Sequence, residues 1–360
     1  MAPFPERDID IASAWMRGLG DVVVPREPLL PLSRSVNSKL TTLCPRLDAW
    51  LKGGVPTRSV TEIAGEAGSA KTQLALQLLI AAQLPREMGG LDGTAVYVHT
   101  EGRAPLRRLK QLVASHPAVR AFVDANGDGV DFLRGAYVVE TLDDPEGLWT
   151  ALASVASVLG DAGTAAGPGR GAGNPPPKPV RLIVVDSVSS PFRDAADAST
   201  TKGAFSRARA LSRVAALLRE YAHRHDVAVV VTNHVVDAVR ADAAPIVSAA
   251  GGLVRTRDRN DAATILGPAG EASSSGRPVT PALGLFWANC VNTRLFLRRS
   301  GGSAGGFGGG EGVGGGGVVG GVTREARVVF SSHLPHSKDA DEGGAPMAFV
   351  VREEGVFGED

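Results

Sequence analysis

The sequence has little cysteine, no excess charge of either sign and no long apolar run, and each shortage narrows the class of protein. Its 360 residues include two cysteines, Cys44 and Cys290, whose separation fits no metal-ligand spacing and which indicate a reducing compartment. Basic and acidic side chains number 38 each, so any contact with DNA must come from local patches rather than from global charge. No apolar stretch is long enough to span a bilayer, and the acidic N-terminus does not have the form of a secretory signal. We therefore expect a soluble intracellular protein with no membrane partner.

Three segments have compositions that cannot build a core. Residues 1–36 hold few periodic apolar positions and several prolines, which predicts a flexible N-terminal arm or linker. Residues 161–180 are rich in glycine, alanine and proline, and residues 301–321 are mostly glycine, so both are predicted to be low-complexity insertions. The second lies between RLFLRR and EARVVF, the arrangement expected of an expanded hairpin loop. The remainder, residues 37–360, is expected to form one core without solenoid repeats.

Within that core, short apolar runs alternate with amphipathic segments. Strands are predicted over residues 59–64, 95–99, 181–186 and 227–232. Helices are predicted around residues 74–81, 106–113 and 211–221, the first of them ending before Pro85. This alternation predicts an α/β fold with a mostly parallel central sheet flanked by helices, of the phosphate-loop ATPase kind, and a C-terminal β-hairpin.

Residues 65–72 read GEAGSAKT, which fits the phosphate-loop pattern G-x-x-x-x-G-K-[ST] except that Ala70 stands in place of the second glycine. In such a loop, backbone N–H groups surround phosphate oxygens, the lysine reaches the β- and γ-phosphates, and the hydroxyl holds Mg²⁺. The alternative is a chance turn of small residues, although a strand before and a helix after favour the loop. The predicted nucleotide contacts are Gly65, Glu66, Ala67, Gly68, Ser69, Ala70, Lys71, Thr72 and Gln73.

Ala70 is expected to weaken nucleotide binding without abolishing it. If the glycine of the pattern takes a positive φ, a Cβ there costs on the order of 1 kcal/mol. Such a cost lowers affinity several-fold, which is small beside the interactions of a bound Mg–ATP.

Polar residues end three other predicted strands. Asp186 ends RLIVVD, where a carboxylate lies beside the Mg²⁺. Glu101 follows AVYVHT and is a candidate to orient the water that attacks the γ-phosphate, the alternative being a solvated carboxylate. Asn233 and His234 follow VAVVVT, where a side chain can sense the γ-phosphate, although a histidine there is more often an ordinary loop residue.

Several stretches together resemble the RecA-like eukaryotic recombinases and their paralogs, and within that family most resemble a plant-like form of one of the repair paralogs. The specific ones are DSVSSPFR, LGLFWANCVNTR and SSHLPHS, since many ATPases share the nucleotide motifs. The resemblance covers roughly residues 38–360 apart from the two insertions. It implies a RecA-like core, the cofactors ATP and Mg²⁺, and catalytic roles for Lys71 and Glu101. It also implies Mg²⁺ contacts from Thr72 and Asp186.

The resemblance places His234 where filament-forming relatives carry a glutamine that links the γ-phosphate to the DNA-binding loops, which calls that link into question here. It implies a first DNA-facing loop over residues 194–207 and a second over residues 237–283. The DNA contacts it implies are Lys202, Arg207, Arg240, Arg255, Arg257 and Arg259. Alternatively, RTRDR is a solvated loop paired with its own aspartates. Residues 333–335, HLP, resemble the segment that covers a neighbour's ATP.

The resemblance implies a recombinase paralog acting in the nucleus, in homologous recombination repair of DNA double-strand breaks. The partners it implies are the C-type recombinase paralog, the main strand-exchange recombinase, and single-stranded or branched DNA. ATP is expected near a subunit boundary, with slow, DNA-dependent hydrolysis. The small N-terminal DNA-binding domain of many relatives is not expected, since 36 residues are too few for it. The alternatives are a scaffold with a vestigial nucleotide site and a true strand-exchange recombinase; a bacterial-type repair ATPase would need four zinc-binding cysteines.

Overall fold

The computed structural model describes residues 38–127, 131–141, 143–160, 178–193, 201–238, 246–247, 253–254, 271–300, 322–337 and 345–359. The predicted arm, residues 1–36, and the Gly-rich insertion lie outside these ranges, and their boundaries stay predictions. So do the predicted DNA contacts Arg240, Arg255, Arg257 and Arg259, together with the side chain of Lys202.

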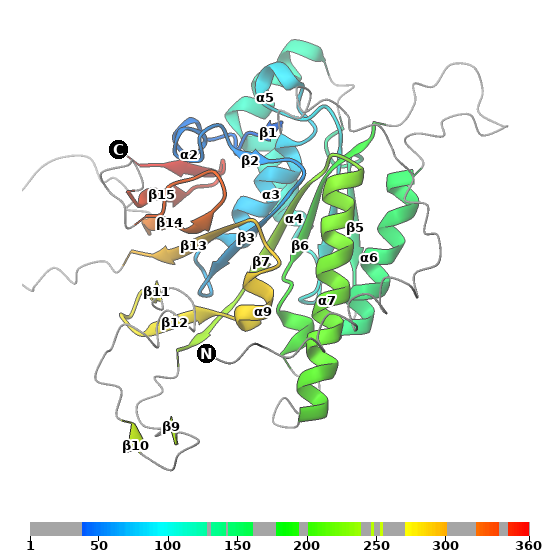
Figure 1. Ribbon diagram of the computed structural model, residues 1–360. Helices are drawn as coiled ribbons and strands as arrows, with labels where there is room; N and C mark the ends of the chain where they lie inside the picture. The colour runs from blue at the N-terminus through cyan, green and yellow to red at the C-terminus, as the bar shows by residue number, and fades with distance from the viewer. Residues whose placement is uncertain are drawn as a thin grey trace, which may run out of the picture. The chain divides into compact units, whose positions relative to one another are not determined.

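A nine-stranded sheet forms the centre of residues 38–359, in the order β16-β15-β14-β13-β3-β7-β6-β4-β5 (Figure 1). Six neighbouring strands run parallel: β13 (Thr293–Arg299), β3 (Ser59–Gly65), β7 (Ala228–Asn233), β6 (Val180–Asp186), β4 (Thr94–His99) and β5 (Ala136–Glu140). The antiparallel strands β14 (Arg324–Ser331), β15 (Met347–Val351) and β16 (Val356–Gly358) complete one side. The predicted fold class is therefore confirmed, including the C-terminal hairpin, since β13 and β14 flank residues 301–321.

Helices cover both faces of the parallel part (Figure 1). Side chains alternate across a strand, so Leu182 and Val184 of β6 pack on one face while Ile183 and Val185 pack on the other. The first face is covered by α3 (Lys71–Ala81), α4 (Leu106–Ser115) and α5 (Pro117–Asn126). The second is covered by α6 (Pro145–Gly160) and α7 (Thr201–Arg224). Both faces of β3, β4, β6 and β7 are buried, which explains their largely apolar sequences.

Short elements occupy the rest of the described chain. A small sheet joins β11 (Glu271–Ala272), β12 (Pro278–Pro281) and β8 (Val235–Asp237), and α9 (Gly284–Ala288) follows β12. Near the start lie β1 (Lys39–Leu40), α2 (Pro45–Trp50) and β2 (Val55–Pro56). The remaining elements are β9 (Ile246–Val247), β10 (Leu253–Val254) and the 3₁₀ turns Arg86–Met88 and Ser190–Phe192. No described helix combines the length and apolar character needed to cross a membrane.

Three segments predicted from composition or resemblance are more regular than expected. β6 begins at Val180, so the end of the predicted 161–180 insertion is part of the central sheet. The first predicted DNA-facing loop is helical from Thr201, because α7 starts there. The second, residues 237–283, contains β11 and β12, and β12 pairs with both β11 and β8, so that these three strands form a structured stem.

Candidate functional site

The predicted site residues meet at one edge of the sheet, because the parallel strands β3, β4, β6 and β7 all end there (Figure 1). β3 runs into the phosphate loop, and β4 runs into Thr100 and Glu101. Asp186 ends β6 opposite His99 of β4, and Asn233 ends β7 opposite Ala64 of β3. Sequence reasoning therefore selected residues from four strand ends that the fold brings together.

The loop between β3 and α3 has the backbone that a phosphate cradle requires. Gly68 has φ 74° and Ala70 has φ 84° and ψ 16°, both in the left-handed region that favours glycine. At Gly65, an added Cβ would lie 2.2 Å from the carbonyl oxygen of Leu297 in β13, so only glycine fits. The loop ends at the first turn of α3, where backbone N–H groups have no partner within the helix.

Lys71 lies across this loop. Its Nζ donates hydrogen bonds to the carbonyl oxygens of Gly65, at 2.8 Å, and Glu66, at 2.9 Å. The side chain is buried, and this burial lowers the pKa of Lys71 although Asp186, Glu101 and Glu66 act in the opposite direction. The ammonium group is thus held by two backbone carbonyl oxygens, which phosphate oxygens could replace, and it interacts electrostatically with three nearby carboxylates.

Asp186 is buried and held at both carboxylate oxygens. Thr232 Oγ1 donates to Oδ1, and the hydroxyl of Tyr97 donates to Oδ2 at 2.9 Å. Burial and the charge of Asp186 raise the pKa of Tyr97, so its hydroxyl stays protonated and remains a donor. The carboxylate is therefore fixed in direction at the sheet edge.

Glu101 and His234, expected to act separately, contact each other. Nε2 of His234 hydrogen-bonds Oε1 of Glu101, and Ser187 Oγ donates to the same oxygen at 2.8 Å. The hydrogen bond from His234 lowers the pKa of Glu101 to about 2, against a smaller opposing effect of burial. Arg193, which the sequence analysis did not select, adds a positive charge nearby. Glu101 is ionised at neutral pH, with one oxygen occupied by neighbouring side chains.

The buried carboxylate of Glu62 in β3 fixes Asn233 at the end of β7. Asn233 Nδ2 donates to Glu62 Oε1 at 2.6 Å and to the carbonyl oxygen of Ala282 at 2.9 Å. Glu62, fully buried in β3, also accepts from Trp287 Nε1 at 3.1 Å and pairs with the guanidinium of Arg294. Sequence reasoning missed this network, although a glutamate inside a strand buried on both faces signals a buried cationic partner.

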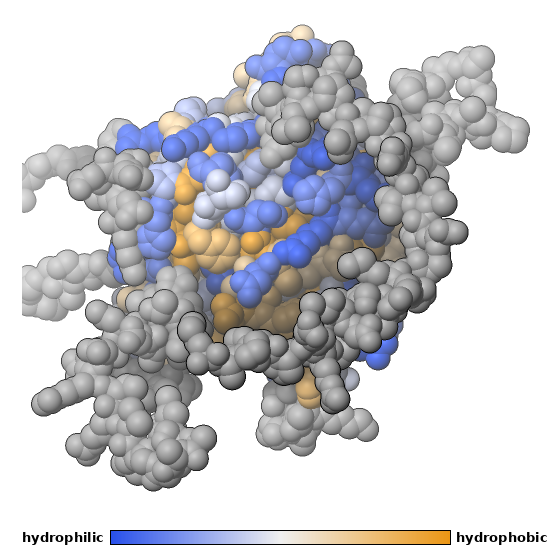
Figure 2. All heavy atoms as spheres, in the orientation of Figure 1, coloured by the Kyte–Doolittle hydropathy of each residue, from blue (hydrophilic) through white to orange (hydrophobic). Residues whose placement is uncertain are grey.

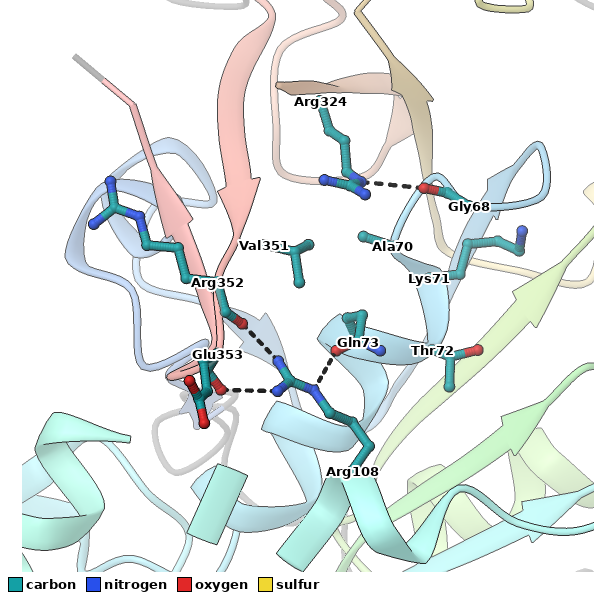
Figure 3. Close-up of a pocket in the computed structure, with 10 residues that line it drawn as sticks. All are labelled: Gly68, Ala70, Lys71, Thr72, Gln73, Arg108, Arg324, Val351, Arg352 and Glu353. Atoms are coloured by element: carbon teal, nitrogen blue, oxygen red, sulfur yellow. Dashed lines mark hydrogen bonds between the residues drawn. The ribbon is translucent and has the colours of Figure 1, made fainter. Parts of the chain in front are cut away.

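A pocket of about 520 Å³ adjoins the phosphate loop (Figure 3). Arg108 of α4 lies in it and donates to Gln73 Oε1 at 2.7 Å and to the carbonyl oxygens of Arg352 and Glu353. Lys71, Thr72, Val351 and Arg352 all line this pocket, and in Figure 3 the terminal atoms of Lys71 and Thr72 point away from Val351 and Arg352. Arg108 was also missed, because its sequence context is that of any amphipathic surface helix.

A second pocket, of about 530 Å³, is lined by residues of α7, β8 and β12 and of the turn between β11 and β12. Arg207, one of the predicted DNA contacts, lines it together with Arg193, Arg277 and His234. Val236, Leu285 and Phe286 lie on nearby elements and are about half exposed. Figure 2 shows apolar side chains where Figure 1 places α9. This pocket therefore combines positive charge with adjoining apolar surface.

The remaining predicted contacts keep their status as predictions. The carboxylate of Glu66 is turned to Ser274 and Arg299 instead of Lys71, and the side chain of Ala67 is exposed. The 333–335 segment follows β14, and His333 hydrogen-bonds Ser331 through Nδ1 at 3.1 Å. Among the described residues, no group of three acidic, histidine or cysteine side chains is placed to bind a metal, so Mg²⁺ here would depend on phosphate oxygens as well.

Comparison with known proteins identifies the family. The profile of the Rad51 family matches residues 33–123 and 176–253, which include the phosphate loop, Glu101, Asp186 and His234. The DNA repair protein XRCC3 homolog of Arabidopsis thaliana is 33% identical over 328 residues, 89% of this chain and 93% of that protein. The DNA repair protein XRCC3 of Bos taurus is 32% identical over 324 residues, 89% of this chain and 75% of the other. The DNA repair protein rhp57 of Schizosaccharomyces pombe is 29% identical over 288 residues, 77% and 74% of the two chains.

These matches confirm the resemblance seen in DSVSSPFR and LGLFWANCVNTR, and membership of the family implies ATP binding. The chain therefore belongs to the Rad51 family, and like its XRCC3 relatives it is a RecA-like recombinase paralog of DNA repair by homologous recombination.

Proposed function

We propose that the chain binds Mg–ATP at the phosphate loop and works in a complex with a second recombinase paralog, the C-type relative. The main strand-exchange recombinase associates more loosely, and the complex repairs double-strand breaks in the nucleus. The observation that carries this proposal is the meeting of the left-handed loop, Lys71 and the anchored carboxylate of Asp186 at one sheet edge.

The residues present fit a magnesium nucleotide. Lys71 is held by two carbonyl oxygens, contacts that phosphate oxygens can replace with a gain in charge complementarity. Thr72 and Asp186 would hold Mg²⁺ together with the phosphates, and the loop amides would hold the phosphate oxygens. The pocket beside the loop would take the nucleoside, with the planar guanidinium of Arg108 available to stack on a base.

Hydrolysis by this site is expected to be slow, and to depend on DNA. One oxygen of Glu101, Oε1, already accepts from His234 and Ser187, which leaves only Oε2 to direct a water. The nucleotide then acts mainly as a ligand whose occupancy sets the affinity between subunits. A subunit boundary near the loop, with residues 333–335 of one subunit over the ATP of another, would provide that dependence.

DNA contact is proposed for the face that carries the second pocket. Arg207 lines this pocket, and Lys202, Arg240, Arg255, Arg257 and Arg259 are the further basic residues proposed there. Guanidinium groups with nearby apolar side chains suit the backbone and bases of single-stranded or branched DNA.

A pull-down from nuclear extract tests the assembly, with and without a non-hydrolysable ATP analogue and Mg²⁺. We expect a recombinase paralog to be recovered more strongly with the analogue, and Lys71→Ala to remove the difference. Lys110→Ala, at an exposed lysine of α4, is the matched control and should behave as the natural chain. Recovery of no recombination protein under either condition would contradict the proposal.

One observation favours a second candidate, a scaffold that does not use its nucleotide site. The hydrogen bond from His234 occupies one oxygen of the carboxylate that would direct the attacking water, which disfavours turnover without affecting the fold. If Lys71→Ala leaves both complex formation and repair unchanged, the scaffold is the better description.

A further inference from the structure

The side chain of Glu66 in the phosphate loop is hydrogen-bonded to the turn between β11 and β12, which belongs to the stem of the second predicted DNA-facing loop. Glu66 Oε2 accepts a hydrogen bond from Ser274 Oγ at 2.9 Å, and Oε1 accepts from the backbone N–H of Ser274 at 3.2 Å. The backbone N–H of Arg299, in β13, also donates to Oε1 at 3.2 Å. The Glu66 side chain is only 15% exposed, so this carboxylate is largely enclosed by the groups it binds.

The same residue also contacts the phosphate-binding lysine. The carbonyl oxygen of Glu66 accepts from Lys71 Nζ at 2.9 Å and from the backbone N–H of Ser69 at 3.2 Å. When Lys71 turns to a phosphate, Glu66 loses one of the two partners that fix its backbone. A change at the inner side of the loop therefore reaches the residue whose carboxylate holds Ser274.

Ser274 belongs to a tight turn between β11 and β12. The turn is closed by backbone hydrogen bonds from Ser273 to Arg277, at 2.8 Å, and from Gly276 to Ser273, at 2.9 Å. β12 pairs with β8, which follows His234 directly, and the backbone N–H of Ala282 donates to the His234 carbonyl oxygen. A displacement of Ser274 is thus passed to the two strands from which the second loop extends.

We propose that Glu66 is a positioning residue that couples nucleotide occupancy to the stem of the second DNA-facing loop, through its hydrogen bonds to Ser274. This coupling rests on the proposed function, since it requires a nucleotide at Lys71. It provides a connection from the phosphate loop to the DNA face that does not pass through residue 234. The histidine at that position therefore does not by itself uncouple the two sites.

Amide hydrogen exchange measures this coupling directly, because the Ser274 N–H donates to Glu66. We would follow residues 271–283 with and without Mg²⁺ and a non-hydrolysable ATP analogue, in the natural chain, Ser274→Ala and Glu66→Ala. Affinity for a fluorescent single-stranded thymidine oligomer, with and without the analogue, gives the coupling factor between the sites. Ser275→Ala is the matched control, since Ser275 Oγ bonds Ser273 and Arg277 in the same turn.

In the natural chain and in Ser275→Ala, we expect the analogue to change the exchange rates and the oligomer affinity by about 5-fold or more. In Ser274→Ala and Glu66→Ala, both changes should fall below about 2-fold. In Ser274→Ala, which lies outside the nucleotide-binding loop, the affinity for the analogue alone should stay within about 3-fold. A purely structural role would lower stability but leave the coupling factor unchanged. Ser274→Ala decides the question by itself if Glu66→Ala does not fold.

The outcomes separate this inference from the proposed function. Coupling that persists in both variants, or a natural chain that binds analogue and oligomer independently, overturns the role of Glu66 and leaves the proposed function standing. A natural chain that binds no analogue overturns both.

Discussion

Replacement of Ala70 by glycine should tighten nucleotide binding, because Ala70 is the one residue of the phosphate loop whose side chain opposes its backbone conformation. Its φ of 84° lies in the left-handed region, which costs a residue with a Cβ on the order of 1 kcal/mol. The bound phosphates require this conformation. The strain therefore weakens binding to the extent that Ala70 leaves the left-handed region when the loop is free of nucleotide. With about 1.4 kcal/mol per tenfold in affinity, full relief corresponds to about a 5-fold lower dissociation constant.

Titration calorimetry with Mg²⁺ and a non-hydrolysable ATP analogue measures this gain. The matched control is Ala67→Gly, in the same loop but at a residue whose φ is not positive. We expect no gain from the control, since glycine there adds only backbone freedom. Stability should change little in Ala70→Gly, because glycine raises the entropy of the unfolded chain by about 0.4–1 kcal/mol and so offsets the relief of strain.

Two results would refute the reasoning. Equal affinity of Ala70→Gly and the natural chain would mean that the strain is not borne by the nucleotide complex. An equal gain in Ala67→Gly would mean that flexibility of the loop, and not the left-handed conformation, limits binding.

Three further substitutions test other parts of the site. His234→Gln should raise the pKa of Glu101 from about 2 toward its ordinary 4.5, as measured by carboxyl NMR titration, and an unchanged pKa would contradict the pairing. The natural chain loses folding stability as pH falls from about 4.5 to about 2, because Glu101 must be protonated, and the variant should lose less over that range. Hydrolysis, measured by phosphate release, should increase by up to about 100-fold. Arg294→Met should cost about 3–5 kcal/mol in denaturant unfolding because it leaves Glu62 charged and buried, and a loss under about 1 kcal/mol would contradict that account. Arg108→Ala should weaken binding of the nucleotide analogue about tenfold by calorimetry, and no change would exclude the adjacent pocket as the nucleoside site.

The central strands and the phosphate loop could be predicted because their signals are local. RLIVVD and AVYVH are apolar runs of strand length, and GEAGSAKT is a contiguous motif, so neither needs knowledge of a distant partner. Parallel strands then bring Asp186, Glu101 and Asn233 to one edge by topology alone. Ala70 is the instructive case, since its expected cost was conditional on a positive φ at that position, and the structure has a φ of 84° there.

The pairings at the site could not be predicted, because each joins residues far apart in the sequence. Glu101 meets His234 across 133 positions, and Glu66 meets Ser274 across 208. The local sequences around Glu101 and Glu66 do not indicate whether each carboxylate bonds a distant side chain or is solvated. Glu62 differs from these pairs, since a charged residue within a fully buried strand predicts that a partner exists, although not which residue it is.

The two departures from the family pattern act on different steps, and this difference bears on what the nucleotide is for. Ala70 costs at most about 1 kcal/mol of binding, which a multidentate magnesium nucleotide readily exceeds. His234 instead engages the carboxylate that would direct water, so it acts on turnover and leaves the loop, Lys71 and Asp186 in place. A site that keeps its nucleotide-binding groups but has an impaired hydrolytic carboxylate holds bound ATP for a long time before hydrolysing it. In the function and the coupling proposed above, nucleotide occupancy rather than hydrolysis would then be the signal, passed to the DNA face by Glu66 and to a second subunit.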